Sequence, residues 1–202
     1  MTSKKLETTH YVFKQKIKKS LDFIGEVNSL GLRSPHLYSA YELAFLKTFT
    51  AWETFIEDVF IAYMTGHITR KCKPKTYLKK ITKEHAYDLL KGVRDYPDWT
   101  RMDQVLKLAD LYFIDGAPFH LPLSRINTIF NEMKKIRDAI SHVSSNSRDT
   151  FLGIIRANLT SYDKNMTPGE FLSRNTQRTN NDSFLNYYIR YLMIASEQIV
   201  PL

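Results

Sequence analysis

Apolar residues recur every three or four positions along most of the chain, which is the spacing of one face of an α-helix. The two clearest stripes predict helices over about 9–30 and from Ser34–Pro35 to Gly66. Further stripes predict helices over about 83–91, 102–113, from a break at 116–122 to Ser141, and 183–199. No segment shows the strict alternation typical of a strand. The pattern predicts an all-α protein, an up-and-down helical bundle with additional short helices, as a single domain over residues 1–202.

Polar segments separate the predicted helices. A turn is expected around Tyr96–Asp98, and the run from Ser144 to Ser147 is expected to end the helix before it. Residues 150–159 show only weak periodicity. The polar stretch that follows contains Pro168–Gly169 and Asn180–Asn181 and is expected to lie outside regular structure.

Composition favours some kinds of binding partner and excludes some kinds of site. The 29 Lys and Arg against 21 Asp and Glu give a net charge of +8, which favours phosphate-bearing partners. Cys72 is the single cysteine, so an intramolecular disulfide framework and a Cys-rich zinc site are excluded. The N-terminus lacks the apolar region of a signal peptide, and charged residues interrupt the most apolar stretch, 38–64. We therefore expect a cytoplasmic protein with no membrane association.

Residues 70–80 form the most basic segment, with six Lys or Arg and no acidic residue. Both an ordinary solvated loop and a phosphate-contacting patch fit this composition. Under the second interpretation, Lys73, Lys75 and Lys79 are candidates for binding RNA.

The strongest chemical signal is the segment from Arg137 to His142 at the end of an apolar-striped helix. Cleaving RNA without a metal needs a base, an acid and a cation beside the phosphate. Imidazole titrates near neutral pH, and guanidinium can hold two phosphate oxygens. Residues five apart on a helix point about 140° apart, so Arg137 and His142 converge only if the helix ends between them. A favourable interaction with the helix dipole would equally explain both residues there.

The segment Arg137–His142 resembles the R-x(4–6)-H motif of the HEPN superfamily of all-helical ribonucleases and nucleotide-associated proteins. Residues 51–58, 166–172 and the closing helix with Tyr188–Ile189 and Ala195 resemble its RiboL-PSP branch, so the similarity spans about 30–200. The resemblance implies a HEPN-type bundle and a metal-independent endoribonuclease without a cofactor, in which 2′-OH attack leaves a 2′,3′-cyclic phosphate. It also implies a homodimer with two motifs facing one cleft, and a toxin or phage-defence effector with an antitoxin or another defence protein as partner.

On this basis Arg137 and His142 are the catalytic candidates, and no metal site is expected. Candidates for orienting the imidazole are Asp138 and Ser141, each of which is equally explained as a residue of the helix surface. Glu53 is a further candidate for supporting the site, although its place on the long second helix favours an ordinary solvated or paired carboxylate. Lys134, beside the motif, is a further candidate for binding RNA. Two alternatives stay open, namely a non-catalytic HEPN-fold module that binds RNA, a nucleotide or a partner protein, and a structural helical adaptor.

Overall fold

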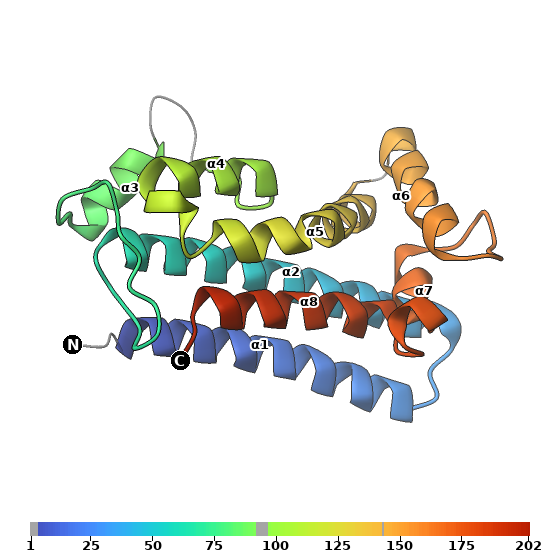
Figure 1. Ribbon diagram of the computed structural model, residues 1–202. Helices are drawn as coiled ribbons and strands as arrows, with labels where there is room; N and C mark the ends of the chain where they lie inside the picture. The colour runs from blue at the N-terminus through green and yellow to red at the C-terminus, as the bar shows by residue number, and fades with distance from the viewer. Residues whose placement is uncertain (1–3, 92–96, 143) are drawn as a thin grey trace. The chain divides into compact units, whose positions relative to one another are not determined.

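The computed structural model describes residues 4–91, 97–142 and 144–202 (Figure 1). Within these ranges the chain forms eight α-helices and two 3-10 helices and no strand. The helices are α1 (Lys4–Ser29), α2 (Ser34–Met64), α3 (Lys83–Lys91), α4 (Met102–Tyr112), η1 (Ile114–Gly116), α5 (His120–Ser141), α6 (Ser145–Asn158), α7 (Pro168–Ser173), η2 (Gln177–Thr179) and α8 (Phe184–Ile199). The predicted all-α helical bundle is confirmed. The turn predicted around Tyr96 lies partly outside the described residues.

Contacts divide the chain into two compact units. Unit 1 contains Met1–Lys14, Ala51–Asn127 and Leu192–Leu202, and unit 2 contains Gln15–Thr50 and Thr128–Tyr191. Helices α1, α2, α5 and α8 each contribute residues to both units. That the whole chain is one domain stays a prediction.

Unit 1 has its core around the C-terminal half of α2, which carries several large aromatic side chains. Phe55 of α2 stacks on Phe13 of α1 with ring centroids 4.8 Å apart, and Trp52 meets Phe13 edge-on at 5.9 Å. The hydroxyl of Tyr63 donates a hydrogen bond of 2.8 Å to the carbonyl oxygen of Ile199 in α8. These aromatic side chains are almost fully buried, so their apolar area supplies much of the stability of this unit.

Unit 2 joins the N-terminal half of α2 to α5, α7 and α8. Phe49 of α2 stacks on Phe130 of α5 at 5.3 Å, and Phe171 of α7 stacks on Phe184 of α8 at 4.2 Å. All four rings are buried. Their packing holds α5, the helix that carries the Arg137–His142 segment.

Helix α7 lies in the stretch expected to be irregular, so that expectation is wrong. Thr167 caps the helix by accepting a hydrogen bond from the Glu170 N–H, and Pro168 occupies the first turn, where its missing N–H costs nothing. Gly169 packs on the backbone of Tyr38 so closely that a Cβ would overlap the Tyr38 carbonyl oxygen. The short helix therefore depends on contact with α2, which no local pattern shows.

Two helix boundaries also differ from the prediction. Helix α5 begins at His120, so Pro122 lies in its first turn, where proline is tolerated, and not in a break. The run beginning at Ser144 does more than end α5. Ser144 and Ser147 exchange side-chain-to-backbone hydrogen bonds in a capping box, which starts α6.

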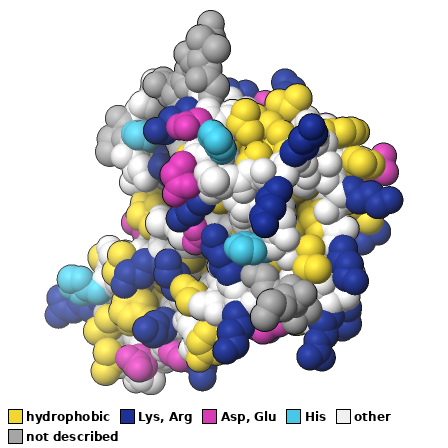
Figure 2. Space-filling model, turned by 90° about the vertical axis from the view of Figure 1, so that its left-hand side faces the viewer, with side chains coloured by type: hydrophobic (Ala, Val, Ile, Leu, Met, Phe, Trp, Pro, Cys, Tyr) yellow, Lys and Arg dark blue, Asp and Glu magenta, His cyan; other side chains and the backbone are white. Residues whose placement is uncertain are grey.

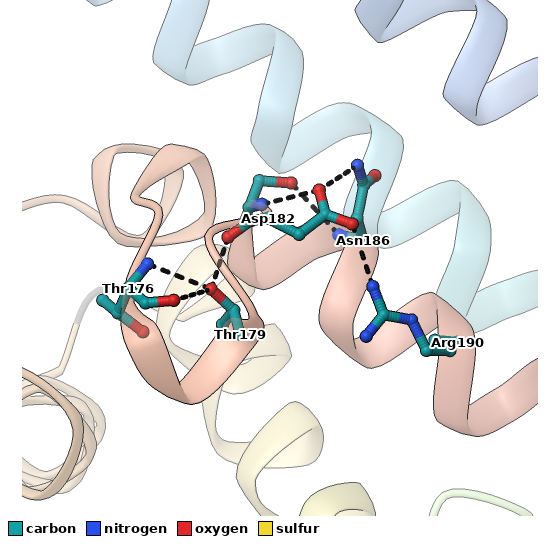
Figure 3. Close-up of polar contacts among 6 residues, drawn as sticks. Thr176, Thr179, Asp182, Asn186 and Arg190 are labelled. Atoms are coloured by element: carbon teal, nitrogen blue, oxygen red, sulfur yellow. Dashed lines mark hydrogen bonds and ion pairs between the residues drawn. The ribbon is translucent and has the colours of Figure 1, made fainter.

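The start of α8 is fixed by one carboxylate (Figure 3). Asp182 accepts hydrogen bonds from the Ser183 N–H at 2.8 Å and the Asn186 side chain at 2.6 Å, and its other oxygen lies 3.0 Å from Arg190. Thr179 donates to the backbone carbonyl of Asp182. This network orders the polar turn between η2 and α8.

Across the described parts of the chain, no helix is both long and apolar enough to cross a membrane.

Candidate active site

Helix α5 ends at Ser141, between Arg137 and His142. The His142 N–H closes the last turn by donating to the Asp138 carbonyl oxygen at 2.9 Å. The His142 carbonyl oxygen then accepts hydrogen bonds from the Ser147 hydroxyl at 2.7 Å and the Ser144 N–H at 3.1 Å. The backbone of His142 is therefore held between the end of α5 and the cap of α6, and the predicted end of the helix between the two motif residues is confirmed.

A pocket of about 390 Å³ opens at this junction within unit 2. It is lined by Lys134, Lys135, Arg137, Asp138, His142, Ser144, Asn146, Ser147 and Thr150. Both catalytic candidates thus line the same pocket. The condition for their convergence, that the helix ends between Arg137 and His142, is met.

Positive charge dominates this pocket. Asp138 is the one carboxylate in the lining, and it accepts hydrogen bonds from Arg137 at 3.0 Å and Lys134 at 3.2 Å. The side chains of Arg137, Asp138 and Lys134 are 35%, 32% and 30% exposed, so solvent weakens both ion pairs. Lys135 is exposed and forms no ion pair with any described residue. An anion entering the pocket would meet more positive than negative charge.

The imidazole of His142 is exposed and accepts or donates no hydrogen bond with the side chains that the structure describes. Asp138 was a candidate to orient this imidazole, but its two oxygens contact Arg137 and Lys134 instead. Ser141 is exposed and is absent from the lining of the pocket. In this structure neither residue orients His142.

The remaining predicted residues lie in unit 1, whereas the pocket is formed by unit 2 alone. Glu53 is a half-buried residue of α2 and does not line the pocket. Lys73, Lys75 and Lys79 are exposed in the segment between α2 and α3. Lys134 is the one RNA-binding candidate that lines the pocket.

Sequence reasoning did not single out Lys135, Asn146 or Thr150 as site residues. The sequence position of Lys135, next to Lys134 and just before the motif, could have indicated it. Asn146 and Thr150 had no such signal, because Asn146 lies in the polar run expected to end the preceding helix and Thr150 begins the segment with weak periodicity. Their place in the lining follows from the capping box that starts α6.

Cys72 is the only sulfur nucleophile in the chain, and it lies in unit 1. The thiol is half-buried, and burial raises its pKa above the ordinary value. A raised pKa lowers the fraction of reactive thiolate at neutral pH. This favours the interpretation of Cys72 as an ordinary thiol.

Within the described ranges, no three His, Cys, Asp or Glu side chains are grouped so that they could hold a metal ion. No family model, curated protein or solved structure matches this chain.

Proposed function

We propose that this protein is a metal-independent endoribonuclease of the HEPN type that cleaves RNA in the pocket of Arg137 and His142. One observation carries the proposal: α5 ends at Ser141, and Arg137 and His142 both line a single pocket. A cation with a planar fork and a group that titrates near neutral pH are the two kinds of side chain that the reaction needs. The resemblance of the Arg137–His142 segment to the HEPN motif supports the same activity.

The proposed reaction uses the RNA's own 2′-hydroxyl as nucleophile. His142 takes the proton of the 2′-OH, O2′ bonds to the adjacent phosphorus, and the P–O5′ bond breaks. The products are a 2′,3′-cyclic phosphate and a 5′-hydroxyl end. Arg137 stabilises the negative charge that develops on the phosphoryl oxygens, while Lys134 and Lys135 hold neighbouring phosphates.

The leaving 5′-oxygen also needs a proton. His142 is the only histidine in the lining of the pocket, so one chain supplies one imidazole. We infer that two chains pair with their pockets facing each other, so that His142 of the partner subunit acts as the acid. The biological role proposed with this activity is that of a cytoplasmic toxin or phage-defence effector restrained by an antitoxin or another defence protein.

One observation favours a second candidate, a non-catalytic module that binds RNA, a nucleotide or a partner protein. Asp138 engages both Arg137 and Lys134, and no described side chain orients His142. Such a pocket binds a phosphate by charge without positioning a proton-transfer group. This candidate predicts binding without cleavage.

Incubating the purified chain with total RNA in EDTA separates the two candidates. The endoribonuclease predicts RNA fragments from the wild-type chain and none from His142→Ala. His85→Ala, which alters an exposed histidine in α3 of unit 1, is the matched control and should cleave normally. Intact RNA bound by the wild-type chain would reject the nuclease in favour of the binding module.

A further inference from the structure

The segment between α2 and α3 carries a second basic feature, separate from the pocket. Side chains at alternate positions are exposed, and those between them are half-buried. The exposed positions, which we call the basic strip, are Lys71, Lys73, Lys75, Tyr77 and Lys79. Residues 72–76 lie between bends at 70–71 and 77–78, so extended backbone, with a repeat of about 6.6 Å for every two residues, is confined to the middle of the strip.

Backbone hydrogen bonds hold the middle of the basic strip in place. The Tyr77 N–H donates to the Tyr112 carbonyl oxygen at 3.1 Å, and the Ile114 N–H donates to the Lys75 carbonyl oxygen at 2.9 Å. These bonds flank a β-bridge between Thr76 and Phe113. The strip is thus an ordered feature of unit 1.

The basic strip carries four positive charges, and a carboxylate lies near one of them, because Glu197 and Lys71 line the same pocket. Residues 59–83 contain no acidic residue, and none of the four strip lysines forms an ion pair with another described residue. Figure 1 draws this segment at the left, and Figure 2 views that side, where Lys and Arg side chains are spread over the face with some Asp and Glu and hydrophobic side chains among them.

Tyr77 distinguishes the basic strip from an ordinary charged loop. Its side chain is 64% exposed, although a tyrosine ring gains free energy by burial. An exposed ring among evenly spaced lysines matches the two requirements for single-stranded nucleic acid, a stacking surface for a base and cations for the phosphates. A base paired in a duplex has no free face for such a ring.

We propose that the basic strip binds single-stranded RNA, with Tyr77 stacking on an unpaired base and the lysines contacting the phosphates on either side. The inference rests on the proposed function in taking RNA as the ligand, and it specifies the form of RNA that the protein engages. An anionic lipid surface is the weaker alternative, because its protein partners typically present a basic amphipathic helix, and residues 71–79 form no helix.

The test measures binding of a fluorescent 12-nucleotide oligouridylate and of a 12-base-pair RNA duplex by anisotropy. All variants are made in the full-length His142→Ala chain, so that RNA is not cut during the measurement. Tyr77→Ala should weaken binding of the oligouridylate about 5- to 150-fold, the range for loss of one stacked base, and leave duplex binding almost unchanged. Tyr77→Phe, which keeps the ring, should stay within twofold of the parent.

Tyr11→Ala is the matched control, since Tyr11 is 62% exposed and lies elsewhere in unit 1. It should not change either affinity. Changing Lys73, Lys75 and Lys79 together to Gln should reduce the log–log salt slope for the oligouridylate by up to about 2, at about 0.7 for each phosphate contact on a single strand.

Two results of the anisotropy measurements would overturn the proposal: oligouridylate affinities that are the same for Tyr77→Ala and Tyr11→Ala, or an equal loss of affinity for duplex and single strand in Tyr77→Ala. A third measurement is binding to vesicles of anionic lipid, and the proposal is also overturned if the variants of Tyr77 and of the three lysines lose binding to these vesicles and keep binding to RNA. The affinities measured for the basic strip do not depend on whether the protein cleaves RNA. Loss of oligouridylate affinity on Tyr77→Ala, together with no cleavage of RNA by the wild-type chain, would reject the proposed nuclease and keep the strip. Cleavage by the wild-type chain, together with an affinity that Tyr77→Ala does not change, would do the reverse.

Discussion

The guanidinium of Arg137 donates a hydrogen bond of 3.0 Å to the carboxylate of Asp138, the next residue along α5. The other oxygen of that carboxylate lies 3.2 Å from Lys134. A phosphate that binds the Nη1 side of Arg137 must therefore compete with Asp138. Because all three side chains are about one-third exposed, each ion pair stabilises this arrangement by about 1 kcal/mol or less, and RNA phosphate can displace it.

Removing this competitor should strengthen RNA binding. Asp138→Asn keeps the shape of the side chain and frees Arg137 and Lys134, so we predict up to about fivefold tighter binding and a steeper salt dependence. Asp22→Asn, an exposed carboxylate of α1 in the same unit, makes the same change in net charge away from the pocket. Equal effects of the two substitutions on the dissociation constant would show that Asp138 does not compete with phosphate.

Arg137→Lys retains the charge and loses the planar fork. We predict a fall in kcat on the order of 10²-fold with a much smaller change in RNA affinity, because the fork acts on charge that develops only in the transition state. The free energy of unfolding should change by less than about 0.5 kcal/mol, as for other partly exposed positions. Arg148→Lys, on α6 outside the lining, is the control. A large loss of stability in Arg137→Lys would make Arg137 a structural residue.

Local signals predicted the helix boundary at the candidate site. Arg137 and His142 are close in the chain, and the polar run from Ser144 marks the end of α5, so their convergence depends on a single helix boundary. The pairing of Asp138 was missed because the motif suggested histidine as its partner, whereas the nearest cations lie at neighbouring and i−4 positions of the same helix.

Features that depend on distant segments were not predictable. Helix α7 needs the close approach of Gly169 to the backbone of Tyr38, more than a hundred residues earlier in the chain. The basic strip is ordered by hydrogen bonds to Tyr112 and Ile114, which composition does not show. The long apolar stripe of α2, by contrast, predicted its helix from local spacing, and large aromatic side chains on that helix are buried.

Mixed dimers test whether two chains share one cleft. If one His142 is the base and His142 of the partner subunit is the acid, a dimer of wild-type and His142→Ala chains is inactive. At fixed total protein, the cleavage rate should then follow the square of the wild-type fraction once subunits have exchanged. A linear dependence, with exchange verified, would show that each chain acts alone.

His10 gives a stability prediction that does not depend on catalysis. It is 3% exposed, its Nε2 lies 3.1 Å from the Ser196 hydroxyl, and its Nδ1 has no partner among the described residues. Burial lowers the pKa of His10 below the ordinary 6.5, Lys14 lowers it further, and Glu197 raises it. The unfolded chain therefore binds the proton more readily than the folded chain does.

The contribution of His10 to stability is accordingly complete above pH 6.5 and is lost as the pH falls from 6.5 through the lowered pKa of the folded state. We predict that the urea midpoint of the wild-type chain decreases over this interval and that His10→Gln, which cannot titrate, shows a smaller decrease. His36→Gln, at an exposed histidine of α2, should retain the wild-type slope. Parallel slopes for His10→Gln and the wild-type chain would contradict the assignment.

The most direct test of the central claim is to identify the ends that cleavage leaves on a defined RNA oligonucleotide in EDTA, by mass spectrometry. We predict a 2′,3′-cyclic phosphate on one fragment and a 5′-hydroxyl on the other, no such products from His142→Ala, and no cut at a site where a single 2′-deoxy nucleotide replaces the ribonucleotide. Cleavage that needs added magnesium, that persists at the 2′-deoxy site, or that leaves a 3′-hydroxyl and a 5′-phosphate would contradict attack by the 2′-hydroxyl at the Arg137–His142 pocket.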